Sequence, residues 1–217
     1  MKRYRDLFFD LDGTVIDSFE GVSRSYRYAL EKMGREVKET AELRRVIGPP
    51  LSESFERLYG LCGKENEEAV RHYREYYLAN DAVYAFRLYD GIVDAISTLK
   101  ERGYRVSLAT SKPQTMAERI LKRKGLSSLF DFVGGADDAV GRTNKADVIR
   151  YALSALGGSD ARRTLMIGDR MYDTLGAREL GMDTLGVLWG FGSRQELSQS
   201  GVLAIVDSPS ELLAFLP

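Results

Sequence analysis

The chain has 217 residues, 44% of them apolar and 29% charged, and 31 basic residues nearly balance 32 acidic ones. This composition is that of an ordinary globular protein able to bury a sizeable core. The balanced charge gives no reason to expect binding to nucleic acid or to an anionic membrane. Residues 1–12 contain no signal-peptide core, and no apolar stretch approaches the roughly 20 residues of a membrane span. We therefore expect a cytoplasmic protein that is a monomer or a homodimer.

The chain has one cysteine, Cys62, and one histidine, His72. A single cysteine cannot form an intrachain disulfide, which fits a reducing compartment. We expect Cys62 to be buried packing and His72 to occupy a solvated position on a helix over residues 65–80. Serine and cysteine hydrolases of the His-activated type need a positioned imidazole. Any enzymatic chemistry in this chain is therefore expected to come from carboxylates.

Six short apolar runs predict buried strands, and stripes of helical period separate most of them. The first run is Leu7–Leu11. The others are Val106–Ala109, Phe130–Val133, Thr164–Ile167, Thr184–Leu188 and Leu203–Val206. A glycine followed by an apolar residue marks three helix ends, at Gly103, Gly125 and Gly181. Strands that alternate with helices in this way predict an α/β protein with a doubly wound, Rossmann-like parallel sheet.

A long segment separates the first strand from the second, which starts near Tyr104. A structureless loop of that length would be improbable in a compact domain. Apolar residues in the segment recur at helical spacing, first at Phe19, Val22, Tyr26, Leu30 and Met33. We therefore predict an all-helical cap domain at residues 18–88, inserted into an α/β core formed by residues 1–17 and 89–217.

Polar residues follow several of the predicted strands, at the edge where open α/β sheets bind their ligands. They are Asp10, Asp12 and Gly13 after the first strand, the Thr110-Ser111-Lys112-Pro113 stretch after the second, Lys145 at the start of a later helix, and Asp169 and Asp173 after the fourth. Four clustered carboxylates would repel one another, and a hard divalent cation such as Mg²⁺ relieves that repulsion through oxygen ligands. A lysine and a hydroxyl beside them suit a phosphoryl group.

Each of these features, taken alone, has an ordinary structural explanation. An Asp-x-Asp-Gly sequence is most often a turn, and Lys145 alone suits a solvated helix position. Thr110 could cap a helix, and Asp169 and Asp173 could stabilise the start of one. Their joint placement at the ends of strands is what favours a catalytic site.

These motifs resemble those of the haloacid dehalogenase superfamily, and in particular its phosphatases with a helical cap inserted after the first motif. The first motif is Phe9–Ser18, the second contains Thr110, the third is Lys145, and the fourth is Gly168–Asp173. The resemblance covers essentially the whole chain. Three positions depart from the usual pattern without removing a catalytic group: Asp90 and Ala146, where proline is common, and Ser111, where phosphoglycolate phosphatases usually have asparagine.

The resemblance implies a two-step reaction with Mg²⁺ as the cofactor. Asp10 attacks phosphorus and forms an aspartyl-phosphate. Asp12 protonates the leaving alcohol and then activates water. The residues implied to hold the phosphoryl group are Gly13, Thr110, Ser111 and Lys145. Those implied to bind the metal are Asp10, Asp12 through its backbone carbonyl, and Asp169, with Asp173 in support.

The function that the resemblance implies is hydrolysis of a small-molecule phosphate ester, as in phosphoglycolate phosphatases. A nucleotide 5′-phosphatase on the same scaffold is an alternative. A sugar phosphomutase similar to β-phosphoglucomutase is another, and it would return the phosphoryl group to its substrate instead of to water. A non-catalytic phosphate-binding regulator is disfavoured, because the acidic set is intact.

The cap is expected to close over the site and to select the substrate. Its loop Ile47–Leu51 resembles the family's substrate-facing cap loop, and Arg44 and Arg45 could contact an anionic substrate, although two solvated arginines are the simpler interpretation. Tyr73, Tyr76 and Tyr77 are interpreted as packing within the cap in preference to base stacking.

Overall fold

The computed structural model describes residues 3–37 and 39–217. The chain divides into two compact units. The larger one combines the residues up to Ile16 with Leu88–Pro217, and the smaller one is Asp17–Arg87. Each unit has a core of its own and is described separately below.

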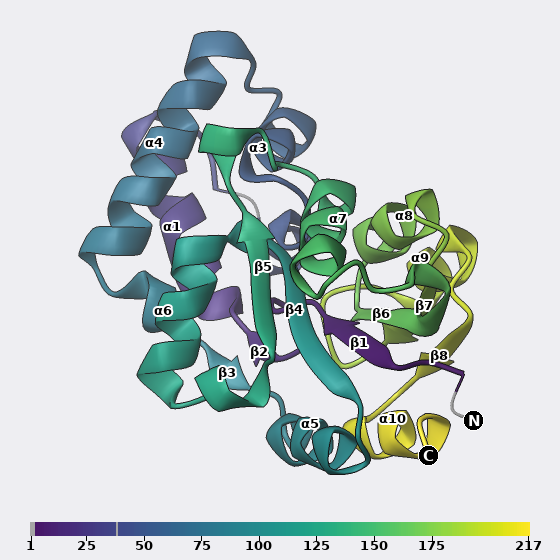
Figure 1. The fold of residues 1–217 in the computed structure, drawn as a ribbon. Coiled ribbons are helices and arrows are strands. Elements are labelled where there is room, and N and C mark those ends of the chain that lie inside the picture. The colour runs from purple at the N-terminus through teal and green to yellow at the C-terminus, as the bar shows by residue number, and fades with distance from the viewer. Residues whose placement is uncertain (1–2, 38) are drawn as a thin grey trace. The chain divides into compact units, whose positions relative to one another are not determined.

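The larger unit is built on a parallel sheet of β1 (Asp6–Phe9), β4 (Arg105–Pro113), β5 (Phe132–Ala136), β6 (Thr164–Gly168), β7 (Asp183–Val187) and β8 (Ala204–Val206). The strand order is β5-β4-β1-β6-β7-β8 (Figure 1). Every residue of the central strand β1 is buried, as expected for a strand covered on both faces. The predicted doubly wound α/β core is confirmed.

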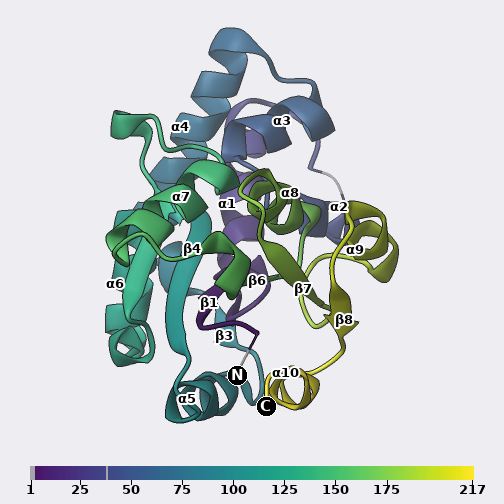
Figure 2. The same ribbon diagram turned by 45° about the vertical axis from the view of Figure 1, so that its right-hand side comes forward.

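Helices flank this sheet: α5 (Ile92–Glu101), α6 (Gln114–Lys124), α7 (Lys145–Ala155), α8 (Met171–Glu179), α9 (Arg194–Ser200) and α10 (Pro209–Phe215). α7 and α8 pack against each other over a buried cluster that includes Phe8 of β1 and Met166 of β6. α5 and α10 lie side by side at the bottom of the views in Figures 1 and 2. Because the six strands are parallel, their carboxyl ends meet at one edge of the sheet.

The predicted helix ends are confirmed at all three glycines. Gly103, Gly125 and Gly181 have φ angles of 82°, 70° and 72°, in the left-handed region that favours glycine. The residue after each glycine donates its amide hydrogen to a carbonyl five residues earlier, as in Tyr104 to Leu99. This is the glycine helix stop that the sequence pattern indicates.

The strand predicted at Phe130–Val133 is displaced in the structure, where β5 runs over Phe132–Ala136. Apolar periodicity could not find its second half, because Gly134 and Gly135 carry no side chain. A Cβ atom on Gly135 would lie 2.4 Å from the Cα atom of Gln114, so the close approach of α6 to β5 requires glycine there.

The smaller unit is helical, with α1 (Phe19–Lys32), α2 (Thr40–Leu43), α3 (Leu51–Tyr59) and α4 (Gly63–Ala79). Its core is aromatic: the ring centroid of Tyr26 lies 4.6 Å from that of Phe55 and 5.1 Å from that of Tyr73. The rings of Tyr73 and Tyr77 stack on each other and are buried, which confirms the packing interpretation for these two. Arg44 and Arg45 are both exposed.

The prediction for Cys62 is wrong, and the prediction for His72 is confirmed for its place on a helix, α4, but not for its degree of exposure. Cys62 is exposed in extended backbone just before α4, whereas the preceding Leu61 is buried, because successive side chains of extended chain point in opposite directions. The His72 side chain is only 15% exposed, and its ring nitrogens lie within 3.7 Å of the carboxylates of Glu68 and Glu75 on the same helix.

Two short strands lie where the chain passes from one unit to the other. β2 (Ile16–Asp17) and β3 (Arg87–Leu88) form a two-stranded sheet, which apolar periodicity could not predict because each strand has only 2 residues. Arg87 Nη2 donates to Asp17 Oδ2 across this pair, at 3.1 Å. In the part of the chain that the structure describes, no helix is both long enough and apolar enough to span a membrane.

Candidate active site

Asp10 lies in a tight loop directly after β1. Its amide donates to the carbonyl of Ile167 at 2.9 Å, so the side chain leaves the chain where the pairing of β1 with β6 ends. The carbonyl of Leu11 accepts from the amides of Thr14, Val15 and Ile16 and folds the loop back on itself. Gly13 has a φ of 87°, and this fits the sharp turn expected for it.

Lys145 begins α7, directly after the N-cap residue Asn144. Its Nζ atom lies 2.9 Å from Asp10 Oδ1 and 2.7 Å from Asp173 Oδ1, and it donates to the carbonyl of Ala109 at 3.0 Å. Burial lowers the pKa of Lys145, but the charges of the two aspartates outweigh burial and raise the pKa above its ordinary value. Lys145 is therefore a buried cation between two carboxylates.

The loop after β6 and the first turn of α8 supply the other two carboxylates, Asp169 and Asp173. Asp169 is 0% exposed, and its Oδ2 atom accepts from the amide of Phe191 at 2.7 Å. Its Oδ1 atom is buried and has no hydrogen-bond partner among the residues that the structure describes. Asp173 Oδ2 accepts from the amide of Arg170 at 3.1 Å, which also fixes the start of α8.

Glycines make the close approach of these groups sterically possible. A Cβ atom on Gly13 would lie 2.2 Å from Asp169 Oδ2, and one on Gly190 would lie 2.4 Å from the same atom. A Cβ atom on Gly168 would lie 2.3 Å from the carboxylate of Asp173. Two loops therefore pack backbone directly against the Asp169 carboxylate, in space that no side chain could share.

This cluster has the properties of a site for a divalent cation. Asp10, Asp169 and Asp173 are buried, and each offers one carboxylate oxygen within 4.8 Å of the others. Burial, and then the charges of Asp173 and Asp10, raise the pKa of Asp169 well above its ordinary value, and burial is the main cause that raises the pKa of Asp173 to about 6. A hard cation with oxygen ligands fits here, since it would neutralise the excess charge and satisfy the orphaned oxygen.

Asp12 lies in a different setting, beside a lysine to which the sequence analysis gave no role. Lys112 Nζ lies 3.1 Å from Asp12 Oδ2, and the two side chains are only 7% and 13% exposed. The amide of Lys112 donates to Thr110 Oγ1 at 3.2 Å, in the last part of β4, where its pairing with β5 shifts register. In the same part of β4, Thr110 is buried and Ser111 is half-buried.

The structure thus gathers four of the residues expected to act: Asp10, Lys145, Asp169 and Asp173. Asp12 pairs with Lys112, and Thr110 lies on the same strand, β4, as that lysine. Besides Lys112, the amide of Phe191, which donates to Asp169, was not predicted from the sequence. A backbone donor has no residue type of its own that a sequence could reveal.

A model of the haloacid dehalogenase-like hydrolase family matches residues 7–187. The chain belongs to this family. A solved structure of a haloacid dehalogenase-like hydrolase from Streptococcus pneumoniae is 32% identical, has a TM-score of 0.92 and covers 100% of both chains. The 5′-nucleotidase of Pseudomonas aeruginosa is 40% identical over 195 residues, which are 90% of this chain and 87% of that protein.

A further relative carries the name of a transferase. The tyrosine-protein kinase PtkA of Mycobacterium tuberculosis is 36% identical over 200 residues, 92% of this chain and 67% of that protein. Membership in the haloacid dehalogenase-like hydrolase family makes the chain an enzyme of the phosphatase type, acting on a phosphate ester. The carboxylate chemistry expected from the near absence of histidine agrees with this.

Proposed function

We propose that this protein is a magnesium-dependent phosphomonoesterase that hydrolyses a small organic phosphate through an aspartyl-phosphate on Asp10. The observation that carries the proposal is the buried cluster in which Lys145 lies between Asp10 and Asp173, beside the orphaned oxygen of Asp169. Such a cluster costs stability unless a cation and an anionic ligand complete it. A phosphate ester with Mg²⁺ is the pair whose charges suit it best.

In the first half-reaction, an oxygen of Asp10 attacks phosphorus and the bond from phosphorus to the leaving-group oxygen breaks. A carboxylate is already ionised and needs no activating base, and Lys145 holds it in place. Asp12 donates its proton to the leaving oxygen, so that an alcohol departs. When bound, Mg²⁺ would be held by Asp10, Asp169 and the Asp12 carbonyl and would stabilise the charge on the phosphoryl oxygens.

In the second half-reaction, water attacks the phosphorus of the aspartyl-phosphate. Asp12, now ionised, takes a proton from that water, and the bond between phosphorus and the Asp10 oxygen breaks. Inorganic phosphate leaves, and both aspartates return to their starting states. We assign the phosphoryl oxygens to the hydroxyls of Thr110 and Ser111, to Lys145 and to the backbone at Gly13, where alignment and charge neutralisation provide the catalysis.

The proposed substrate class is a small organic phosphate such as phosphoglycolate. A nucleoside 5′-monophosphate is the second candidate, favoured by the 40% identical relative that is named a 5′-nucleotidase. Transfer of the phosphoryl group to an acceptor other than water is the third, since it needs the same Asp10 intermediate and one relative is named a kinase. The three candidates differ in where the phosphoryl group goes and in what leaves.

A kinetic screen separates these candidates. The full chain is assayed with Mg²⁺ for release of inorganic phosphate from phosphoglycolate, nucleoside monophosphates, sugar phosphates and pyrophosphate, with EDTA as the metal-free control. We expect steady phosphate release from at least one monoester, abolished by EDTA and restored by added Mg²⁺. Turnover that persists in EDTA, or loss of substrate without phosphate release, would contradict the proposal.

A further inference from the structure

The segment between β7 and α9, Trp189–Ser193, contacts both loops that carry the buried carboxylates. Trp189 Nε1 donates to the carbonyl of Thr14, at 2.9 Å, in the loop after β1. The amide of Phe191 donates to Asp169 in the loop after β6. A Cβ atom on Gly192 would lie 1.8 Å from the carbonyl oxygen of Asp169, so the two backbones are in direct contact.

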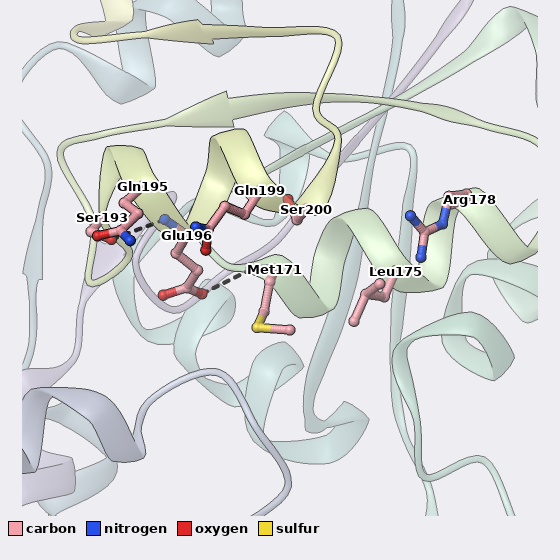
Figure 3. Close-up of a pocket in the computed structure, with 8 residues that line it drawn as sticks. All are labelled: Met171, Leu175, Arg178, Ser193, Gln195, Glu196, Gln199 and Ser200. Carbon is pink, nitrogen blue, oxygen red and sulfur yellow. Dashed lines mark hydrogen bonds between the residues drawn. The ribbon is translucent and has the colours of Figure 1, made fainter.

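Glu196, on α9 just beyond this segment, joins it to the start of α8. Its Oε1 atom accepts from Arg170 Nε and from the amide of Met171, both at 2.9 Å. Figure 3 shows the Glu196 side chain pointing from α9 toward Met171, the first residue of α8. The Arg170 side chain in this pair is buried, at 7% exposure, and that of Glu196 is 21% exposed. The contact is therefore largely shielded from solvent.

The two donors to Glu196 belong to residues placed between the acidic groups of the candidate site. Arg170 directly follows Asp169, and its amide donates to Asp173 Oδ2. Holding the side chain of Arg170 and the amide of Met171 therefore restricts the backbone on which both carboxylates depend. When a group that orients a metal ligand from outside is removed, metal affinity typically falls by about 10- to 100-fold.

We propose that Glu196 is a positioning residue for the metal site, acting through Arg170 and Met171 to hold Asp169 and Asp173 in metal-binding geometry. This inference rests on the proposed function, because it requires a cation at the carboxylate cluster. Its rival is that Glu196 only caps α8. A cap alone would stabilise the fold without changing how tightly the cluster binds a cation.

The test is thermal unfolding of the full chain titrated with MgCl₂ at constant ionic strength, for the wild type, Glu196→Ala and Glu196→Gln. We expect Glu196→Ala to need about 10- to 100-fold more Mg²⁺ for the half-maximal rise in Tm. Glu196→Gln keeps an oxygen that can accept both hydrogen bonds, so its Mg²⁺ dependence should stay close to that of the wild type. Gln199→Ala is the matched control, since Gln199 lies on α9 with Glu196, and both residues line the pocket drawn in Figure 3.

A folded Glu196→Ala variant with the Mg²⁺ dependence of the wild type would overturn the inference and leave Glu196 a helix cap. If that variant does not fold, Arg170→Met decides, because it removes one of the two donors and should shift the Mg²⁺ dependence in the same direction. An unchanged dependence in folded Arg170→Met would overturn the inference equally.

Asp169→Asn separates this inference from the proposed function. If Asp169→Asn and the wild type respond alike to Mg²⁺, or neither responds, the cluster holds no cation and both proposals fail. If Asp169→Asn loses the response while Glu196→Ala keeps that of the wild type, only the role of Glu196 fails. Loss of response in Asp169→Asn together with the expected shift in Glu196→Ala supports both.

Discussion

Each end of the central strand β1 has a buried aspartate, but only the one at the amino end is fully paired with a cation. At the amino end, both oxygens of Asp6 are bound by Arg105, with Nε to Oδ1 at 2.6 Å and Nη2 to Oδ2 at 2.9 Å. Arg105 also donates to the carbonyl of Leu156 and to the hydroxyl of Ser159. One negative charge faces one positive charge, and each polar atom of Asp6 has a partner.

At the carboxyl end of the same strand, Asp10 belongs to a cluster of three buried carboxylates around the single amine of Lys145. Asp169 keeps an orphaned oxygen, and its pKa is raised. Burying charge is costly at either end, and only the amino end is complete by itself. The comparison teaches that pairing, and not burial, separates a structural charge cluster from one built to receive a ligand.

Asp10→Asn should give the largest effect and tests the carboxyl end directly. The amide cannot form the covalent intermediate, so we expect kcat to fall by at least about 10⁴-fold while the protein stays folded. The measurement is phosphate release under Mg²⁺ saturation, with circular dichroism to check the fold. Activity near that of the wild type in a folded Asp10→Asn variant would refute the assignment of the nucleophile.

Asp12→Ala tests whether the aspartates at the carboxyl end of β1 have different roles. Asp12 pairs with Lys112 and lies outside the cluster of Asp10, Asp169 and Asp173. Loss of a general acid should reduce turnover of alkyl phosphates by roughly 10²- to 10⁴-fold. p-Nitrophenyl phosphate has a leaving group that needs little protonation, so its turnover should fall less. The check is the ratio of kcat/KM for the two substrates, and equal losses would count against the acid role of Asp12.

Arg105→Met tests the amino end and should affect the fold instead of the chemistry. It leaves the buried carboxylate of Asp6 without its cation, which typically costs about 3–5 kcal/mol of the free energy of unfolding. Urea denaturation should show this loss, whereas kcat per folded molecule should stay as in the wild type. A large fall in kcat with unchanged stability would mean that Arg105 serves the chemistry and not the fold, so that the amino end of β1 would not be purely structural.

The sequence alone was enough to predict the parallel core and the edge at which the carboxylates gather. Strands such as Thr164–Ile167 are continuous apolar runs, and the groups that follow them are placed by topology. Side-chain contacts between distant segments could not be predicted from the sequence. Arg105 pairs with Asp6, which is 99 positions away in the chain, and Glu196 contacts Arg170, which is 26 positions away. The pattern Ser193-x-x-Glu196 marks a helix start but does not reveal a second contact made in space.

Asp169→Asn should give the smallest effect, and one of opposite sign to a usual core substitution. Without divalent cations, the variant removes a buried charge from an overcrowded cluster and keeps an oxygen that can accept from Phe191. At pH 8 in EDTA we expect stabilisation of about 1 kcal/mol, or about 2–4 °C in Tm. Lower stability of the variant under these conditions would show that the cluster carries no excess charge.

The difference in metal-free stability between Asp169→Asn and the wild type should depend on pH, because the pKa of Asp169 is raised. From the ordinary carboxyl pKa up to the raised native value, the native state holds more protons than the unfolded chain, so metal-free stability falls as pH rises. The advantage of Asp169→Asn should therefore grow as the pH rises through the raised pKa of Asp169, and shrink as the pH falls and Asp169 becomes protonated. With Mg²⁺ the order should reverse, because only the wild type gains stability by binding the cation. Tm values measured from pH 5 to 8, with EDTA and with Mg²⁺, test both signs.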